Sequence, residues 1–173
     1  MNNPRCMTTQ REIPLNDSQA SPTEHANVNF PPPFIHGVGI FSAIGVEQIL
    51  PGVLPAPENF GWLGFVMVSF SLFLALMSFR EFNRAKNPVP PNQPIQSLMT
   101  SGPFRFSRNP LYVALAFLHG GIAFLSGNTW ILTTLPLTLL FVRYYVISRE
   151  EAYLVRRFGQ TYLEYMARVR RWL

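Results

Sequence analysis

Residues 61–79, GWLGFVMVSFSLFLALMSF, constrain this chain more than any other stretch, because nineteen residues in a row carry no charged side chain. As an α-helix rising about 1.5 Å per residue, such a run is long enough to cross the hydrocarbon core of a bilayer. Three further apolar runs cover about residues 34–50, 111–127 and 128–147. We therefore predict an all-α integral membrane protein with about four transmembrane helices.

The composition agrees with a membrane protein. Charged residues make up 13% of the chain, which is about half their share in soluble domains. Fifteen Phe, six Tyr and three Trp residues suit a lipid boundary with interfacial anchors. The net charge of +5 would also fit a nucleic-acid-binding protein, but that class needs its basic residues on a water-facing domain. We therefore predict the bilayer, and no nucleic acid, as a partner.

Lysine and arginine gather on one side of the predicted membrane. Five of the fourteen lie in the loop 80–110 and six in the tail 148–173, whereas the connection 51–60 carries none. By the positive-inside rule, the loop, the tail and both termini are cytoplasmic. The polar residues 1–33 are predicted to be a disordered tail, and residues 34–173 one membrane domain.

The C-terminal tail shows helical periodicity. Its apolar residues recur at spacings of three and four, with a mostly basic opposite face and Gly159 as a candidate kink. These residues are Leu154, Phe158, Tyr162, Tyr165, Val169 and Trp172. We predict an amphipathic cytoplasmic helix, and a helix resting on an anionic membrane surface would by itself explain this segment.

The acidic pair Glu150 and Glu151 directly follows the fourth apolar run. Carboxylates at the bilayer boundary are costly unless they are paired or used. Residues 111–127 and 128–147 form a tight hairpin, so Arg108 at its start is expected to lie near Glu150 at its end. Such a pair either closes the bundle or binds the carboxylate and ammonium groups of an amino acid moiety.

Two motifs, one around Arg108 and one that begins at Glu150, resemble those of a known family. The first is Gly102-Pro103-Phe104-x-x-x-Arg108-Asn109-Pro110-x-Tyr112. The second is Glu150-Glu151-x-x-Leu154-x-x-x-Phe158-Gly159-x-x-Tyr162-x-x-Tyr165. Together they resemble the isoprenylcysteine carboxyl methyltransferase family and its phospholipid methyltransferase relatives, over about residues 96–173.

This resemblance implies an integral membrane enzyme that transfers a methyl group from S-adenosylmethionine, bound in a cytoplasm-facing pocket. We predict Arg108 and Glu150 as catalytic residues, because Arg108 can orient a carboxylate of the cofactor or substrate and Glu150 or Glu151 can hold the cationic partner. The implied cofactor-binding residues are Gln96, Ser97, Leu98, Met99, Phe104, Asn109, Pro110, Leu111, Tyr112 and Glu151. The family does not use the Rossmann fold, and the chain has no G-x-G-x-x-G after a strand.

The chain departs from the family pattern at several of these positions. The family often has His-Asn-Leu-Val where residues 96–99 read Gln-Ser-Leu-Met, a tyrosine at Phe104 and a histidine at Asn109. The prenylcysteine enzymes place a substrate-facing arginine where this chain has Val146. Arg143 and Arg149 are the nearest candidates to replace it.

Methyl transfer from a sulfonium is an in-line displacement, so the site mainly has to align its reactants away from water. A carboxylate acceptor is already ionised near neutral pH, which favours an isoprenylcysteine-like, lipophilic or prenylated substrate. A lipid amine would need a base, for which a glutamate is the candidate. A non-catalytic membrane protein is the alternative outside the enzyme class.

His119 lies in the third apolar run beside Gly120 and Gly121. A polar residue next to small ones predicts a contact between helices. No second histidine or cysteine lies near it in the sequence, so no metal site is predicted. Pro136 predicts a kink in the fourth run.

Overall fold

The computed structural model describes residues 28, 30–51, 60–89 and 93–173. The elements in chain order are α1 (Pro32–Ile49), α2 (Gly61–Arg84), the 3-10 turn η2 (Gly102–Arg105), α3 (Pro110–Ser126), α4 (Thr129–Phe141), the π-helical segment η3 (Val142–Ile147), α5 (Ser148–Phe158) and α6 (Gln160–Arg168). Within these ranges no residue forms a strand, so the predicted all-α class is confirmed. Most of the predicted tail, residues 1–27 and 29, lies outside the described residues.

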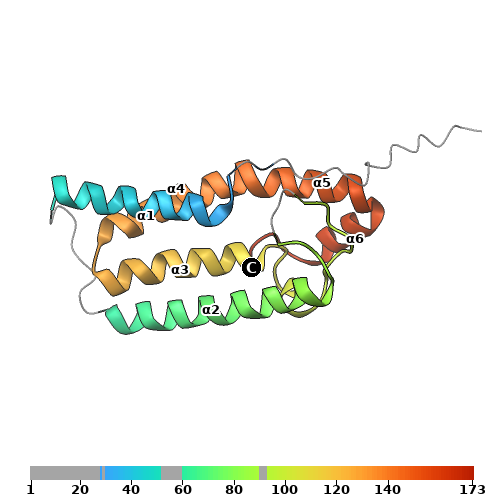
Figure 1. The fold of residues 1–173 in the computed structure, drawn as a ribbon, viewed down its shortest axis with the longest axis horizontal. Coiled ribbons are helices and arrows are strands. Elements are labelled where there is room, and N and C mark those ends of the chain that lie inside the picture. The colour runs from blue at the N-terminus through green and yellow to red at the C-terminus, as the bar shows by residue number, and fades with distance from the viewer. Residues whose placement is uncertain (1–27, 29, 52–59, 90–92) are drawn as a thin grey trace, which may run out of the picture.

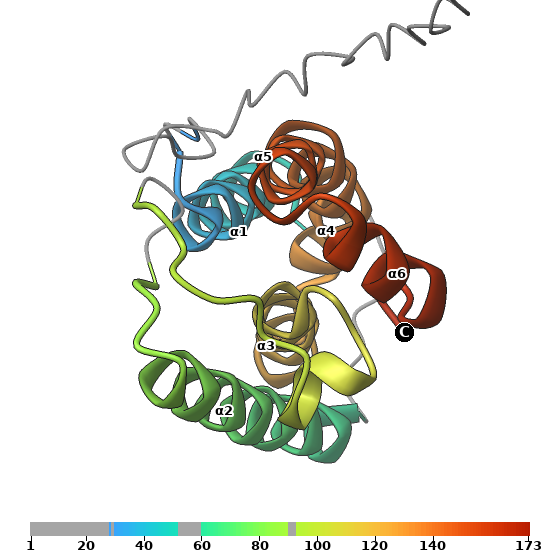
Figure 2. The ribbon, with the colours of Figure 1, turned by 90° about the vertical axis from the view of Figure 1, so that its right-hand side faces the viewer.

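The helices α1, α2, α3 and α4 run alongside one another (Figure 1). The helix α3 packs against both α2 and α4, and α1 packs mainly against α4. At one end of the bundle, α5, α6 and the connection between α2 and α3 come together, as the end-on view in Figure 2 shows. This end therefore collects the segments that carry both sequence motifs.

Small residues hold α2 against α3. Gly64, Ser71 and Ser78 are spaced by seven and are buried. A Cβ at Gly64 would lie 2.8 Å from the carbonyl oxygen of Gly121, so the two backbones nearly touch there. Ser71 Oγ donates a 2.7 Å hydrogen bond to the carbonyl oxygen of Ala114. Close approach through small residues and interhelical hydrogen bonds is the packing that helices use in lipid.

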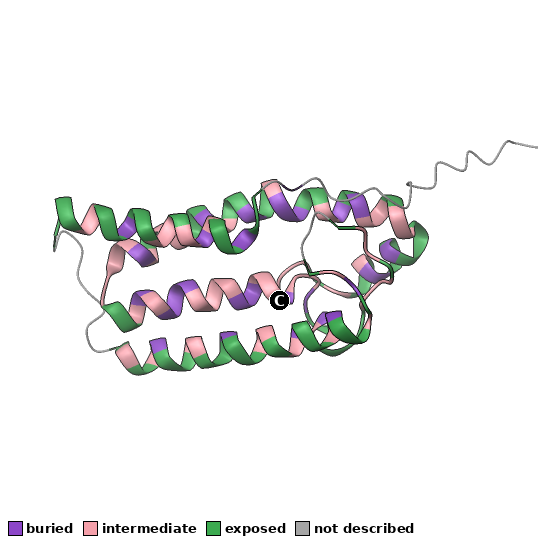
Figure 3. Cartoon of the chain, viewed as in Figure 1, coloured by how far each residue is buried: buried purple, intermediate pink, exposed green. Residues whose placement is uncertain are grey.

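The opposite face of α2 is apolar and exposed (Figure 3). Trp62, Phe65, Phe73 and Leu76 expose 59% to 67% of their surface. A continuous apolar face of this kind suits contact with lipid and is rare on soluble monomers. The helix Gly61–Arg84 and the continuous helix Thr129–Phe158 are long and apolar enough to cross a membrane, and α3 is a shorter apolar helix.

Several helix boundaries differ from the predicted ones. The helix α2 extends five residues beyond residue 79, to Arg84. The fourth run continues through Pro136 and η3 into α5 as one helix of 30 residues, Thr129–Phe158. The predicted C-terminal helix is two helices, because Gly159 adopts a φ of +53° between α5 and α6. Only glycine takes this conformation without strain, so Gly159 sets the turn that directs α6 back toward α3.

Candidate active site

The loop before α3 holds Arg108 at the end of the bundle. The backbone N–H of Asn109 donates to Ser107 Oγ at 3.1 Å, and Pro110 begins α3. The backbone N–H of Arg108 donates to the carbonyl oxygen of Arg170 at 2.9 Å. The main chain around Arg108 is therefore fixed on both sides, which aims its side chain inward, where it is 9% exposed.

The acidic pair of α5 meets this arginine, but through Glu151. Arg108 Nη2 lies 3.0 Å from Glu151 Oε1, whose side chain is 8% exposed. We expected Arg108 to pair with Glu150. Adjacent helical residues point about 100° apart, and η3 adds a residue to the turn just before α5. Glu151 therefore faces Arg108, and Glu150 faces elsewhere.

Glu150 meets a phenol instead of a cation. Tyr112 Oη, from the first turn of α3, donates a 2.6 Å hydrogen bond to Glu150 Oε1. Within the described part of the chain, Glu150 takes part in no ion pair. The two neighbouring carboxylates thus have different partners: arginine for Glu151 and the phenol of Tyr112 for Glu150.

Arg171 is the second cation on Glu151, and the sequence did not suggest it. Its Nε donates to Glu151 Oε1 at 3.1 Å, and its Nη2 contacts Glu151 Oε2 at 2.5 Å. The hydrogen bonds to Glu151 raise the pKa of the Arg171 guanidinium, although burial acts in the opposite sense. Twenty residues and the turn at Gly159 separate the partners, so helical spacing could not reveal the pair.

Arg108, Glu150, Glu151 and Arg171 form what we call the charged cluster. Two tyrosines of α6 lie beside it. Tyr162 and Tyr165 are buried, with ring centroids 6.0 Å apart. Burial, followed by the negative charge of Glu151, raises the pKa of Tyr162 well above its usual range. Burial raises the pKa of Tyr165 to about 12, although the positive charge of Arg108 opposes this. Both phenols are therefore neutral hydrogen-bonding groups, and Tyr165 Oη donates to the carbonyl oxygen of Phe104 at 2.6 Å.

The predicted segment 96–99 lies in the connection that ends at this loop. Asn87 Oδ1 accepts hydrogen bonds from the backbone N–H groups of Gln96 and Ser97, at 2.9 and 3.1 Å. The backbone N–H of Ile95 donates to Tyr153 Oη on α5, at 3.1 Å. The side chain of Asn87 therefore shapes this segment, and Tyr153 ties it to the helix that carries the acidic pair.

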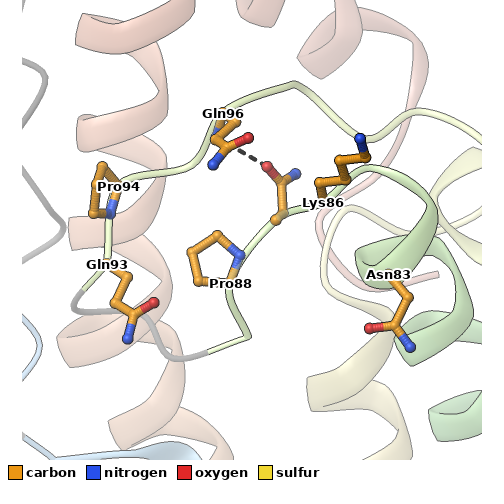
Figure 4. A pocket seen from close by; sticks show the side chains of 7 residues that line it. Asn83, Lys86, Pro88, Gln93, Pro94 and Gln96 are labelled. Atoms are coloured by element: carbon orange, nitrogen blue, oxygen red, sulfur yellow. Dashed lines mark hydrogen bonds between the residues drawn. The ribbon is translucent and has the colours of Figure 1, made fainter.

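Two open pockets lie along the same connection. One, of about 490 Å³, is lined by Gln96 and by amide, lysine and proline side chains (Figure 4). The other, of about 250 Å³, includes Leu98 and Met99 in its lining. Ser97 Oγ donates to the carbonyl oxygen of Ala85 at 3.2 Å, so this side chain serves the fold of the connection.

The remaining predicted cofactor residues stand around the start of α3. Phe104 is buried, with its ring 5.9 Å from that of Phe82. Asn109 Nδ2 donates to the carbonyl oxygen of Arg171 at 2.9 Å. Pro110 is buried in the first turn of α3, and Leu111 is half-buried beside it. These four residues lie in or beside the loop that carries Arg108, not in either open pocket.

Val146 stands where the resemblance to the prenylcysteine enzymes led us to look for an arginine, and it is a core residue. Val146 is fully buried among apolar side chains that include Val142 and Tyr153. Arg143 and Arg149 are both exposed, and their guanidinium carbons lie over the rings of Tyr144 and Tyr145. The ion pairs of the charged cluster thus come from Arg108 and Arg171.

His119 forms the contact between helices that the sequence predicted. Its Nδ1 lies 3.1 Å from Nδ1 of His36 on α1, and both side chains are buried. The sequence gave no sign that His36 would be the partner, because 83 residues separate them. The described residues include no group of three His, Cys, Asp or Glu side chains that could hold a metal ion.

Comparison with known proteins agrees with the motifs. The family model described as phospholipid methyltransferase matches residues 60–161, which is more than half of the chain. No match was found among curated proteins or solved structures. The match runs from the start of α2 into α6 and so includes Arg108, Tyr112, Glu150 and Glu151. The chain belongs to the phospholipid methyltransferase family, which isoprenylcysteine carboxyl methyltransferases share.

Proposed function

We propose that this chain is a multi-pass membrane methyltransferase that uses S-adenosylmethionine at the cytoplasmic face. Membership of the family supports the reaction class. The helices α1 and α3 lie alongside the two long apolar helices, Gly61–Arg84 and Thr129–Phe158, and this arrangement supports four spans (Figure 1). The basic residues of the loop 80–110 and of the tail 148–173 support cytoplasmic termini by the positive-inside rule.

The charged cluster fits the amino acid moiety of the cofactor. Arg108 Nε is buried and has no hydrogen-bond partner among the described groups, so it is a donor suited to a carboxylate. Glu150 is the neighbour of the Glu151 that pairs with Arg108, it accepts from Tyr112, and it has no cation among the described residues, so its carboxylate is suited to an ammonium group. This pairing of a cation-free glutamate with an unsatisfied arginine donor is the observation that carries the proposal.

S-adenosylmethionine, when bound, supplies an electrophilic methyl group on a sulfonium. The residues of this chain bind it, orient the acceptor and exclude water. Arg108, Glu150 and Tyr112 would hold the charged end, with Asn109, Pro110, Leu111 and Glu151 around it. Residues 96–99 and Phe104 would contact the rest of the cofactor from the connection that Asn87 shapes.

A carboxylate acceptor on a lipophilic or prenylated molecule is the first candidate substrate. It needs no base, and the exposed apolar faces of the bundle suit its delivery from lipid. Because Val146 is a core residue, such a carboxylate would depend on Arg108 for its positive partner.

A lipid amine is the second candidate, and the environment of Glu150 favours it. An amine must lose a proton to accept a methyl group, and a carboxylate without a cation is suited to take that proton. The hydrogen bond from Tyr112 orients Glu150 for this role. In this reading, Arg108 serves the cofactor alone.

The test is a calorimetric titration of S-adenosylhomocysteine into the detergent-purified protein and its Glu150→Gln variant. Glutamine keeps the acceptor for Tyr112 and removes only the charge, so the bundle should stay folded. We expect the variant to bind at least about tenfold more weakly, the effect of losing one charge-assisted hydrogen bond. Glu164→Gln is the matched control, because Glu164 is an exposed glutamate of α6.

The same preparations separate the two acceptors. Incubation with S-adenosylmethionine and either a prenylated cysteine or an ethanolamine lipid yields a base-labile ester or a methylated amine, which mass spectrometry distinguishes. If the folded wild-type protein binds no S-adenosylhomocysteine, a non-catalytic membrane protein becomes the better reading.

A further inference from the structure

Residues 169–173 follow α6, and their backbone at Arg170 and Arg171 lies against the loop that leads into α3. The carbonyl oxygen of Arg170 accepts from the backbone N–H of Arg108 at 2.9 Å. The carbonyl oxygen of Arg171 accepts from Asn109 Nδ2 at 2.9 Å and from Ser107 Oγ at 3.4 Å. The segment thus lies across the loop that carries Arg108.

The side chain of Arg171 then reaches the acidic pair. Its Nε and Nη2 contact the two different oxygens of Glu151, which is the two-pronged geometry of an arginine and a carboxylate. Glu151 Oε1 also faces Arg108 Nη2 at 3.0 Å. One carboxylate therefore joins the loop before α3 to residues 169–173, with an arginine from each.

We propose that Arg171 is a positioning residue of the methyltransferase site, which acts through Glu151 and fastens residues 169–173 over the loop 107–109. This inference rests on the proposed function for its effect on the ligand. By holding both oxygens of Glu151, Arg171 fixes the carboxylate that orients Arg108. It also leaves Glu150 as the carboxylate of the pair that can meet a cationic ligand.

The geometry assigns this role to the arginine fork and not to positive charge in general. Two other arginines lie close to Arg171 in the sequence, Arg168 at the end of α6 and Arg170, but both are exposed. The Nε of Arg168 donates to the carbonyl oxygen of Glu164. A lysine at position 171 would carry the charge, but a single ammonium group does not present two parallel donors. Arg171→Lys therefore separates the fork from the charge.

The experiment compares wild type, Arg171→Ala, Arg171→Lys and the control Arg168→Ala, each as the full chain in detergent. Titration with S-adenosylhomocysteine measures affinity. Hydrogen–deuterium exchange of peptides that contain Arg108 measures the bond from its N–H to Arg170. We expect Arg171→Ala to weaken affinity about 10- to 100-fold, the effect of losing hydrogen bonds to a charged group, and to speed exchange at Arg108. Arg171→Lys should recover only part of both losses, and Arg168→Ala should match wild type.

A double-mutant cycle with Glu151→Gln tests whether Arg171 acts through Glu151. If it does, the double variant binds about as weakly as the weaker single variant, because residues in direct contact have non-additive effects. Multiplied losses would overturn the proposal, as would an Arg171→Ala protein with wild-type affinity. Unchanged exchange in peptides from α2 shows that each variant keeps its bundle.

The two measurements also separate this inference from the proposed function. If the folded wild type binds no S-adenosylhomocysteine, the proposed function fails, and Arg171 has no ligand to position. The exchange at Arg108 then decides whether the fastening exists. Exchange that is equal in wild type and Arg171→Ala overturns the fastening as well.

Discussion

Two polar clusters are buried in this bundle, and they differ in charge and in position. At the end of the bundle, Arg108, Glu151 and Arg171 form linked ion pairs beside the hydrogen bond from Tyr112 to Glu150. Between the helices, His36 and His119 meet through their ring nitrogens. Both clusters join segments that are far apart in the sequence.

The histidine contact can be described without any net charge. His119 Nε2 lies 3.0 Å from the carbonyl oxygen of Ile131, which only accepts, so we assign the proton of His119 to Nε2. Its Nδ1 then accepts, and Nδ1 of His36 donates across 3.1 Å. A neutral contact of this kind links α1, α3 and α4, and it leaves Nε2 of His36 buried without a hydrogen-bond partner among the described groups.

The charged cluster has no such balance. Two arginines share Glu151, while none of the cations in the described part of the chain pairs with Glu150. In the proposed function, the ammonium group of the ligand is the cation that Glu150 lacks. Burial and an unpaired polar atom are common to both clusters, and what distinguishes the bundle end is a carboxylate, Glu150, that no described arginine pairs with.

The largest expected effect comes from Glu151→Ala. This change leaves Arg108 as a buried cation without its carboxylate, which typically costs about 3–5 kcal/mol of unfolding free energy. Thermal unfolding in detergent should therefore shift strongly downward, and binding of S-adenosylhomocysteine should be lost. The control is Glu164→Ala, an exposed carboxylate, which should stay within about 0.5 kcal/mol of wild type. A Glu151→Ala protein as stable as this control would show that the cluster is not desolvated.

A smaller effect is expected at the histidine contact. His119→Leu removes the hydrogen bond to Ile131 and leaves the Nδ1 donor of His36 unpaired, at a cost of about 1–3 kcal/mol. His36→Leu combined with His119→Leu should cost little more, because replacing both partners leaves no unpaired group. Affinity for S-adenosylhomocysteine should stay within about twofold in either variant, since each is remote from the bundle end. Loss of binding in a well-folded His119→Leu protein would contradict the view that the histidine contact takes no part in the ligand site.

The helices themselves could be predicted, because each apolar run is long and ends in turn residues or charges. Residues 61–79 gave α2 without its last five residues, and the junction of the runs 111–127 and 128–147 gave the turn between α3 and α4. The continuous helix through Pro136 and η3 could not be predicted, since proline and a π-helical turn interrupt the periodicity that sequence reasoning follows.

The site could be predicted as a neighbourhood but not as a set of contacts. The hairpin brought Arg108 to the acidic pair, as expected, yet a one-residue change of phase made Glu151 its partner. Arg171 was missed because its contact depends on the turn at Gly159. Periodicity assigns Tyr165 to an apolar face, but it does not indicate that the phenol of this residue reaches the carbonyl oxygen of Phe104.

The smallest expected effect is that of Tyr165→Phe. The pH dependence of this effect distinguishes the charged cluster from the histidine contact. Tyr165→Phe leaves the buried carbonyl oxygen of Phe104 without its donor, which costs about 1 kcal/mol. Burial raises the pKa of Tyr165 from its usual 10.0 to about 12. Because the pKa in the folded protein is the higher one, this stabilisation is complete below pH 10 and is lost as the pH rises toward 12. The unfolding temperature should therefore fall less between pH 8 and pH 11 in Tyr165→Phe than in wild type. In His119→Leu it should fall by as much as in wild type. An alkaline loss that is the same in all three proteins would mean that Tyr165 ionises as an exposed phenol does, and that α6 does not seal the charged cluster from water.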